Sequence, residues 1–220
     1  MAITLDIQND IAHLAVDDGK ANALGFALIE EFHANLEKAE EDAKAILISG
    51  RPGRFCAGFD LAVMRESPDK AGELVNAGGH LLLRLFSNPL PIVVACTGHA
   101  LAAGGLTLLS ADTRIGTQGD FKIGLNETAI GMVLPVFGIE LPKARLRQDH
   151  FTPAVVQGKM HSPDEAVEAG FLDMAVAPDA LMETSLAAAG ALSQLPQHSY
   201  HGNKLLIRKD AIATIKASLV

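Results

Sequence analysis

A chain of 220 residues has the length of a single domain, and a composition of 49% hydrophobic and 20% charged residues supplies enough apolar side chains for a buried core. That composition excludes a disordered or fibrous protein. Acidic residues outnumber basic residues by 26 to 18, for a formal net charge of −8, and no dense run of Lys or Arg occurs, so nucleic acid is not expected as a partner.

The predicted elements alternate between short strands and helices. Buried or alternating apolar runs predict strands over residues 3–8, 11–16, 45–49 and 92–96. Apolar positions at helical spacing predict helices over residues 24–41 and 68–86. Asn9-Asp10 predicts the first turn, residues 50–53 (GRPG) a loop, and Pro89 and Pro91 the end of the second helix.

The rest of the chain alternates short helices and strands up to residue 176. From residue 179 onward it is predicted to be helical, with an interruption around residues 196–202. Alternation of this kind predicts an α/β layered fold. We expect a core over residues 1–178 and a C-terminal helical region over residues 179–220, which covers the core or a neighbouring subunit.

Two features of the sequence bear on the compartment. The first ten residues lack the basic patch and apolar run of a signal peptide, so we expect a cytoplasmic protein. Residues 91–110 are uncharged and could be mistaken for a membrane span, but Thr-Gly-His and Ala-Ala-Gly-Gly interrupt them. A buried strand, a turn and a buried helix explain this stretch better, and no membrane is expected as a partner.

Residues 54–61 (RFCAGFDL) follow the Gly/Pro loop directly. The small residues Ala57 and Gly58 allow another group to approach the backbone closely. Asp60 suits the N-cap of a helix that starts near Leu61. Backbone N–H groups here, that of Phe59 among them, are available to an acceptor. Taken alone, the segment is sufficiently explained as a strand, a turn and a capped helix.

Residues 98–108 (GHALAAGGLTL) follow the strand over residues 92–96. Their small side chains predict a tight turn into a helix, and unpaired N–H groups at a helix N-terminus favour negative charge, an oxyanion among others. A closely packed helix without a ligand is the alternative. The glycine spacing matches neither a phosphate-binding loop nor a dinucleotide fingerprint, which excludes nucleotide binding by those modes.

Residues 121–135 (FKIGLNETAIGMVLP) place Glu127 among apolar side chains. Desolvation there raises the pKa of a carboxyl group toward the range useful to a base. A helix cap or a surface position is the alternative, since Asn126-Glu127-Thr128 can begin a helix. A second acid, Glu140, falls in the amphipathic stretch over residues 136–147, where a position on a helix surface is favoured.

Other reactive side chains do not form a recognisable set. The two cysteines lie alone in their segments, which excludes a disulfide framework and a zinc site. Nothing in the sequence arranges Cys56, His99 and Asp60 as a nucleophile, a base and an orienting acid. His198 and His201 lack a nearby carboxylate or Cys set, so a surface loop is favoured over a metal site.

The three segments together resemble the crotonase (enoyl-CoA hydratase/isomerase) superfamily. Its pattern is an AGxD segment, then a glycine-rich turn into a helix, then an acidic residue after an FG(L)xE-like stretch. Asn22-Ala23-Leu24 matches the early NAL motif and residues 162–172 (SPDEAVEAGFL) match the A-x-x-A-G-L-x-D-x-V region, so the resemblance covers most of the chain. It implies an α/β crotonase-like ββα spiral with a short C-terminal helical region.

Carried over by position, the resemblance implies that the amides of Phe59 and Ala103 form an oxyanion hole for a thioester carbonyl, and that Glu127 is the catalytic glutamate. Ala103 stands where the family commonly has Gly, and an amide donor is retained. Leu106 stands where hydratases usually have a second Glu. The substrate-binding positions implied in the same way are Lys20, Ala21, Ala23, Ala57, Gly58, Asp60, Leu61, Leu106, Asn126 and Gly131.

Leu106, together with IGLNET at residues 123–128, looks most like the mitochondrial-type enoyl-CoA isomerase, which moves a 3-enoyl double bond to the trans-2 position. Isomerisation requires one base and an oxyanion hole, whereas hydration usually engages two carboxylates. A one-glutamate enoyl-CoA hydratase is one alternative. A non-catalytic acyl-CoA-binding or assembly subunit, motivated by the loss of the second Glu, is the other.

The resemblance also implies partners. Coenzyme A is expected as part of the substrate, with no separate cofactor and no metal. Lys20, Arg54, Lys204 and Lys209 are candidates for its phosphates. The family's C-terminal helices contribute to oligomer contacts, which implies a homotrimer or hexamer in which these helices pack against neighbouring subunits.

Overall fold

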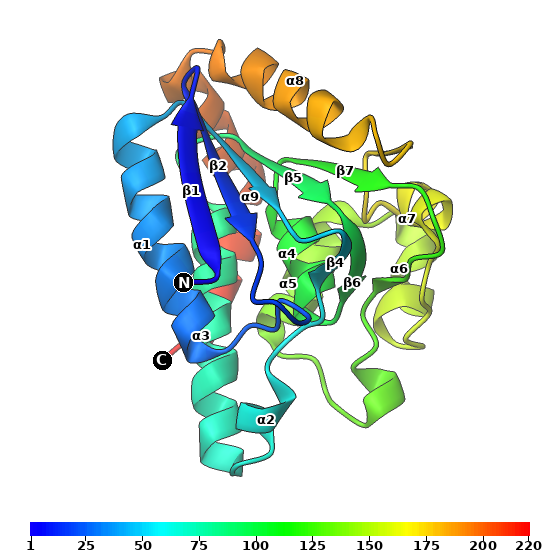
Figure 1. The fold of residues 1–220 in the computed structure, drawn as a ribbon. Helices are drawn as coiled ribbons and strands as arrows, with labels where there is room; N and C mark the ends of the chain where they lie inside the picture. Colours follow the sequence, from blue (N-terminus) through cyan, green and yellow to red (C-terminus); the bar gives the residue numbers. More distant parts are fainter.

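The computed structural model describes residues 1–220, in which strands and helices alternate along most of the chain (Figure 1). The strands are β1 (Ile3–Gln8), β2 (Ile11–Val16), β3 (Ala45–Ser49), β4 (Gly53–Cys56), β5 (Ile92–Cys96), β6 (Gly98–Leu101), β7 (Thr113–Thr117), β8 (Ile123–Gly124) and β9 (Met174–Val176). The helices are α1 (Phe26–Asp42), α2 (Leu61–Met64), α3 (Pro68–Phe86), α4 (Ala103–Ser110), α5 (Val136–Arg145), α6 (Gln148–Val155), α7 (Pro163–Ala169), α8 (Leu181–Ser193), α9 (Gln197–Ser218) and the 3₁₀ turn η1 (Thr128–Ile130).

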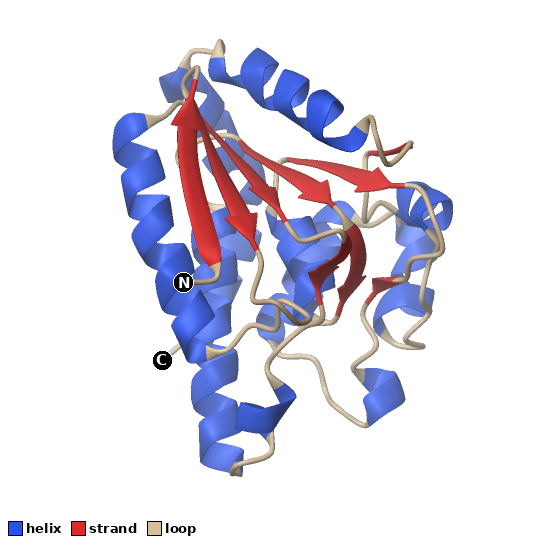
Figure 2. Ribbon diagram, viewed as in Figure 1, coloured by secondary structure: helices blue, strands red, loops and turns tan.

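The larger sheet has six strands in the order β1-β2-β3-β5-β7-β9, all parallel except the β1-β2 hairpin (Figure 2). Strands β3 and β5 are buried along their whole length, as expected for parallel strands covered on both faces. Alternation along β3 divides the core: Ala45 and Leu47 pack with α8, whereas Ile46 and Ile48 belong to the larger cluster that includes side chains of α1 and α3.

The smaller sheet positions the segments that follow its three strands. Strands β3, β5 and β7 each lead into one of its strands, which are parallel and ordered β4-β6-β8. A helix or helical turn follows each of these: α2 after β4, α4 after β6 and η1 after β8. This repeated strand–strand–helix unit is the α/β ββα spiral that the family resemblance implied, and it brings three segments far apart in sequence next to one another.

The predicted strands over residues 3–8, 11–16, 45–49 and 92–96 and the helix over residues 68–86 are confirmed at those residues. Two boundaries differ. The helix predicted over 24–41 begins at Phe26, because Leu24 instead bridges to Phe59. Helix α9 is continuous from Gln197, so the interruption predicted across 196–202 is wrong; the break ends at Pro196, which a helix tolerates at its start.

Residues 91–110, the uncharged stretch, fold as strand β5, strand β6 and helix α4. The tight turn predicted over the small residues is shorter than expected, because residues 98–101 pair as β6 between β4 and β8. No helix of the protein has both the length and the apolar character needed to cross a bilayer.

Helix α9 packs along α3 and α5 of its own chain. Two buried cations anchor it to Asp112, which lies between α4 and β7. Lys204 Nζ donates to Asp112 Oδ2 at 2.7 Å, and Arg208 Nη2 donates to Asp112 Oδ1 at 2.8 Å. Lys204 Nζ also donates to the carbonyl oxygens of Asn88 and Leu90, each at 2.9 Å. The division of the chain at residue 178 stays a prediction.

Candidate active site

The first part of the site is the segment that follows β4. Residues 20–24 run parallel to it: the Leu24 N–H donates to the Gly58 carbonyl at 2.8 Å, and the Asp60 N–H donates to the Leu24 carbonyl at 3.0 Å. In a parallel pair, the residue between two such bonds directs its own N–H away from the partner segment. That residue is Phe59, and its N–H makes no hydrogen bond within the protein. It is a donor available to a ligand.

Two residues hold this segment in place. Asp60 caps α2, since its Oδ1 accepts a hydrogen bond from the Ala62 N–H at 2.8 Å, as the sequence predicted. Gly58 has φ +100, and a Cβ built on it would lie 2.9 Å from the Ala102 Cβ and 3.6 Å from the Ala103 nitrogen. Only glycine fits both the conformation and the space. The segment therefore lies directly against the start of α4.

The start of α4 supplies the second group. The first helical bond runs from the Leu106 N–H to the Ala102 carbonyl at 3.0 Å, so the N–H of Ala103 has no acceptor within the helix. Ala102 has φ 51 and ψ −121, a conformation that non-glycine residues rarely adopt. The chain thereby turns from β6 into the helix within one residue, and it leaves the Ala103 N–H beside the Phe59 segment.

Glu127 supplies the third group, at the N-terminal end of η1. Its side chain is almost entirely buried, at 7% exposed, and Oε2 is buried without a hydrogen-bond partner. Burial raises the pKa of Glu127 to about 7 from an ordinary 4.5, against a smaller lowering from its own backbone N–H. Gly131, at φ 76, ends the turn. The carboxyl group therefore has the pKa of a base that works near neutral pH.

These segments enclose a cavity of about 120 Å³. Apart from Glu127 and the carboxamide of Asn126, whose Oδ1 is also buried without a partner, its side chains are apolar. The lining residues are Ala57, Phe59, Leu61, Met64, Ala102, Asn126, Glu127, Ile130 and Met132. Such a cavity suits the apolar acyl part of a substrate whose polar atom meets the backbone donors.

Five of the predicted site residues line this cavity: Ala57, Phe59, Leu61, Asn126 and Glu127. The others lie in its framework, in the paired segments 20–24 and 57–60, at the start of α4 or at the end of η1. Leu106 is 1% exposed and packs in the core. Ile130 and Met132 belong to the apolar surroundings that the sequence predicted for Glu127. Sequence reasoning missed Met64 and Ala102, because they come from single turns too short to show a periodicity.

Lys20 is the first residue of segment 20–24, at the end opposite to Leu24. A basic groove of about 380 Å³ lies beside it. It is lined by Lys20, Arg54 and His99, and by Arg51, which the sequence did not single out; the Arg51 guanidinium donates to the Lys20 carbonyl at 3.1 Å. Two candidates for a phosphate contact, Lys20 and Arg54, thus lie in one groove.

The other two phosphate candidates lie on α9. Lys204 is the wrong candidate, because it is 4% exposed and its ammonium is bound to Asp112 and two carbonyls. Lys209 is exposed on the same helix.

The reactive side chains set aside in the sequence are engaged elsewhere. Burial raises the pKa of the Cys56 thiol to about 12, so it is no nucleophile at neutral pH. His99 Nδ1 accepts from the Lys122 N–H at 2.9 Å. Glu140 accepts a hydrogen bond from Lys143 at 3.1 Å and does not line the cavity. No group of three or more His, Cys, Asp or Glu side chains is placed to hold a metal ion.

Comparison with known proteins gives one family. The model of the enoyl-CoA hydratase/isomerase family matches residues 6–216. The chain is 31% identical to the mitochondrial enoyl-CoA delta isomerase 1 of Homo sapiens over 204 residues, 90% of this chain and 68% of that protein.

Solved structures agree. A protein of the enoyl-CoA hydratase/isomerase family from Pseudomonas syringae superposes with a TM-score of 0.96 at 40% identity, over 99% of this chain and 94% of that one. An enoyl-CoA hydratase from Mycobacterium ulcerans superposes with a TM-score of 0.95 at 32% identity, over 99% and 96% of the two chains. The names of these relatives include both an enoyl-CoA isomerase and an enoyl-CoA hydratase.

Proposed function

The chain belongs to the enoyl-CoA hydratase/isomerase family, and on that premise we propose that it isomerises a 3-enoyl-CoA to the trans-2-enoyl-CoA with Glu127 as its one base. The observation that carries this proposal is a single carboxyl group, with a pKa of about 7, in an otherwise nearly apolar cavity beside two free backbone donors. A carboxylate in this setting is suited to proton transfer at carbon.

In the proposed reaction, two backbone N–H groups bind the thioester oxygen while the Glu127 carboxylate moves a proton. The N–H groups of Phe59 and Ala103 donate to the thioester oxygen and stabilise the negative charge that develops on it. The Glu127 carboxylate takes a proton from the α-carbon, the electron pair moves into a dienolate, and the same carboxyl group returns the proton at the γ-carbon. No atom is gained or lost, so no cofactor or metal is needed for this step.

Leu106 favours isomerisation over hydration. Addition of water to a 2-enoyl bond needs an oriented water molecule, which in hydratases usually engages a second carboxylate at this position. A leucine side chain cannot hold or deprotonate water, and here it is buried in the core. Hydration with one glutamate stays the second candidate, because a hydratase is among the related structures at 32% identity.

Substrate recognition is proposed along segment 20–24. The apolar cavity takes the reacting end of the acyl chain, and Asn126 and Leu61 are part of its wall. The basic groove at Lys20 is a suitable place for phosphates of coenzyme A, since Arg51 and Arg54 add guanidinium groups that bind such oxygens in a fork.

The test is a side-by-side assay of the purified protein with a 3-enoyl-CoA and with a trans-2-enoyl-CoA, with the products identified by mass and absorbance. Isomerisation leaves the mass of the first substrate unchanged and creates the conjugated thioester absorbance. Hydration adds one water to the second. Turnover of the 2-enoyl substrate alone would favour the hydratase, and an inert protein that binds acyl-CoA would favour a non-catalytic subunit.

A further inference from the structure

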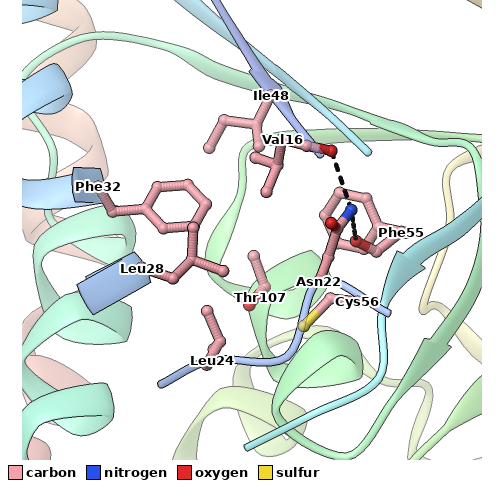
Figure 3. A pocket seen from close by; sticks show the side chains of 9 residues that line it. All are labelled: Val16, Asn22, Leu24, Leu28, Phe32, Ile48, Phe55, Cys56 and Thr107. Atoms are coloured by element: carbon pink, nitrogen blue, oxygen red, sulfur yellow. Dashed lines mark hydrogen bonds between the residues drawn. The ribbon is translucent and has the colours of Figure 1, made fainter. Parts of the chain in front are cut away.

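Asn22 is the most highly connected buried polar side chain near the site. It is 1% exposed, with a left-handed φ of 52. Its Nδ2 donates to the Val16 carbonyl at 2.9 Å and to the Phe55 carbonyl at 3.2 Å (Figure 3). The same nitrogen lies 3.3 Å from the Arg54 carbonyl oxygen. Its Oδ1 accepts from the Asp18 N–H at 3.0 Å. One side chain therefore joins the end of β2, the end of β4 and the loop that follows β2.

These bonds determine where segment 20–24 lies relative to the loop after β4. On one side of Asn22, the Ala21 carbonyl accepts from the Ala57 N–H at 3.1 Å. On the other side, Leu24 holds the residues before and after Phe59 by two backbone bonds. The position of the Phe59 N–H thus depends on the position of segment 20–24, and that segment is anchored through Asn22.

The cavity beside Asn22 is lined mainly by apolar side chains, those of Leu24, Leu28 and Phe32 among them (Figure 3). No other side chain donates a hydrogen bond to the Val16 or the Phe55 carbonyl. Loss of the carboxamide would leave the Val16 and Phe55 carbonyls without this donor.

We propose that Asn22 is a positioning residue for the oxyanion hole: it fixes segment 20–24 against the end of β4 so that the Phe59 N–H points at the thioester oxygen. The inference rests on the proposed function, in which that N–H polarises the carbonyl. Asn22 does not line the cavity that holds Glu127, so it is not expected to touch the substrate. Replacing Asn22 should therefore weaken the polarisation of the thioester carbonyl and leave the basicity of Glu127 unchanged.

The test is infrared spectroscopy of an acyl-CoA with ¹³C at the thioester carbonyl, bound to wild type and to Asn22→Gly. Glycine keeps the left-handed backbone and removes every side-chain bond. In wild type the carbonyl band is expected at lower wavenumber than in free acyl-CoA. In Asn22→Gly it should return toward the free position, and kcat should fall by about 10- to 100-fold, because misplacing a donor by about 1 Å has effects of that size. The kinetic pKa of Glu127 should not move.

The matched control is Asn9→Gly, since Asn9 has the same left-handed φ of 51 in the β1-β2 turn, away from the site. It should leave the band and kcat unchanged. Asn22→Ser puts a single hydroxyl in place of the carboxamide, so it cannot serve the Val16 carbonyl, the Phe55 carbonyl and the Asp18 N–H together. It should shift the band in the same direction by less, and it serves if Asn22→Gly does not fold.

The outcomes separate the two proposals. A folded Asn22→Gly, or a folded Asn22→Ser in its place, with the wild-type band and kcat within twofold would overturn the positioning role. A wild-type protein that binds acyl-CoA without any carbonyl shift would instead contradict the proposed function. A drop in thermal stability alone, without a change in the band, counts against the inference, because a purely structural role predicts that result.

Discussion

Glu127 and Glu140 lie in neighbouring parts of the chain, and their surroundings give them different chemistry. The Glu140 side chain is 17% exposed and pairs with Lys143. Glu127 is buried without a cationic partner, and burial raises its pKa to about 7. A carboxyl group of this kind is partly ionised at neutral pH and is a stronger base than an ordinary carboxylate, which is what removal of a carbon-bound proton needs.

Glu127→Gln keeps the shape of the side chain and removes its ability to accept a proton. General-base catalysis typically contributes about 10²–10⁴-fold, so isomerase turnover should fall by that factor while acyl-CoA affinity changes little. Exchange of the α-protons of a saturated acyl-CoA in heavy water, followed by NMR, should stop in the variant. Glu140→Gln is the matched control and should behave as wild type. Near-normal turnover and exchange in Glu127→Gln would rule out the assignment.

The pH dependence follows from the same group. Because the base must be ionised, kcat/KM should fall about tenfold per pH unit below pH 7 and level off above it. A pKa raised in the folded state also means that Glu127 stabilises the fold fully below pH 4.5, and that this contribution is lost as the pH rises to about 7. Glu127→Gln should accordingly unfold at higher urea concentration than wild type at pH 8. A pH–rate midpoint near 4.5 would contradict the burial argument.

Individual site residues differed in how far the sequence could predict them. The candidate roles of Phe59, Ala103 and Glu127 followed from motifs, each placed at the end of a strand or the start of a helix. Met64, in the single turn of α2, carried no such signal. Lys204 was misassigned because its partner, Asp112, lies 92 positions away and no local pattern reveals the pairing.

At the scale of elements, one carboxylate connects α9 to the turn between α4 and β7. Asp112 is 8% exposed in its side chain and binds both Lys204 and Arg208, and its Oδ2 also accepts from the Ile92 N–H at 2.8 Å. Burial lowers the pKa of both cations while Asp112 opposes that lowering. The helix is therefore held by a charge cluster that tolerates no missing member.

Asp112→Ala should destabilise the protein by about 3–5 kcal/mol, because it leaves two buried cations without their anion. The free energy of unfolding in urea measures this. Asp210→Ala, at an exposed position of α9, should change it by less than about 0.5 kcal/mol. Equal effects of the two substitutions would mean that the cluster does not anchor the helix.

Elements with their own periodicity were predicted to within a residue or two, as β1, β2 and α3 illustrate. Strands β6 and β8 were not predicted, since β8 has only two residues and both exist through pairing with segments distant in sequence. The smaller sheet, which positions the site, is therefore the part of the fold that local patterns reveal least.

At the scale of the whole molecule, α9 packs on its own chain and still presents apolar side chains outward. Leu206 is 72% exposed and Ile207 is 82% exposed. The sequence resemblance implied a homotrimer or hexamer with C-terminal helices at the subunit contacts. An exposed Leu-Ile pair on this helix is consistent with that prediction, because burial against a neighbour would remove it from water.

Light scattering at micromolar concentration should give three or six times the chain mass of 23.1 kDa. Replacing Leu206 and Ile207 together with Glu should lower that mass if α9 contributes to the contact. Lys209→Glu, on an exposed and already polar position of α9, is the control for added negative charge and should not lower it. A wild-type mass of one chain would contradict the assembly.

The order β4-β6-β8 has a consequence for how activity arises during folding. Phe59, Ala103 and Glu127 each follow one strand of this sheet, so each turn of the spiral contributes one group. A nascent chain of 103 to 126 residues would carry both amide donors and no base. A refolding chain would regain its helical signal in circular dichroism before it could turn over a substrate, because local helices form faster than pairings between distant segments. Catalysis in this fold is thus a late event of folding, and its recovery reports that the last turn has docked.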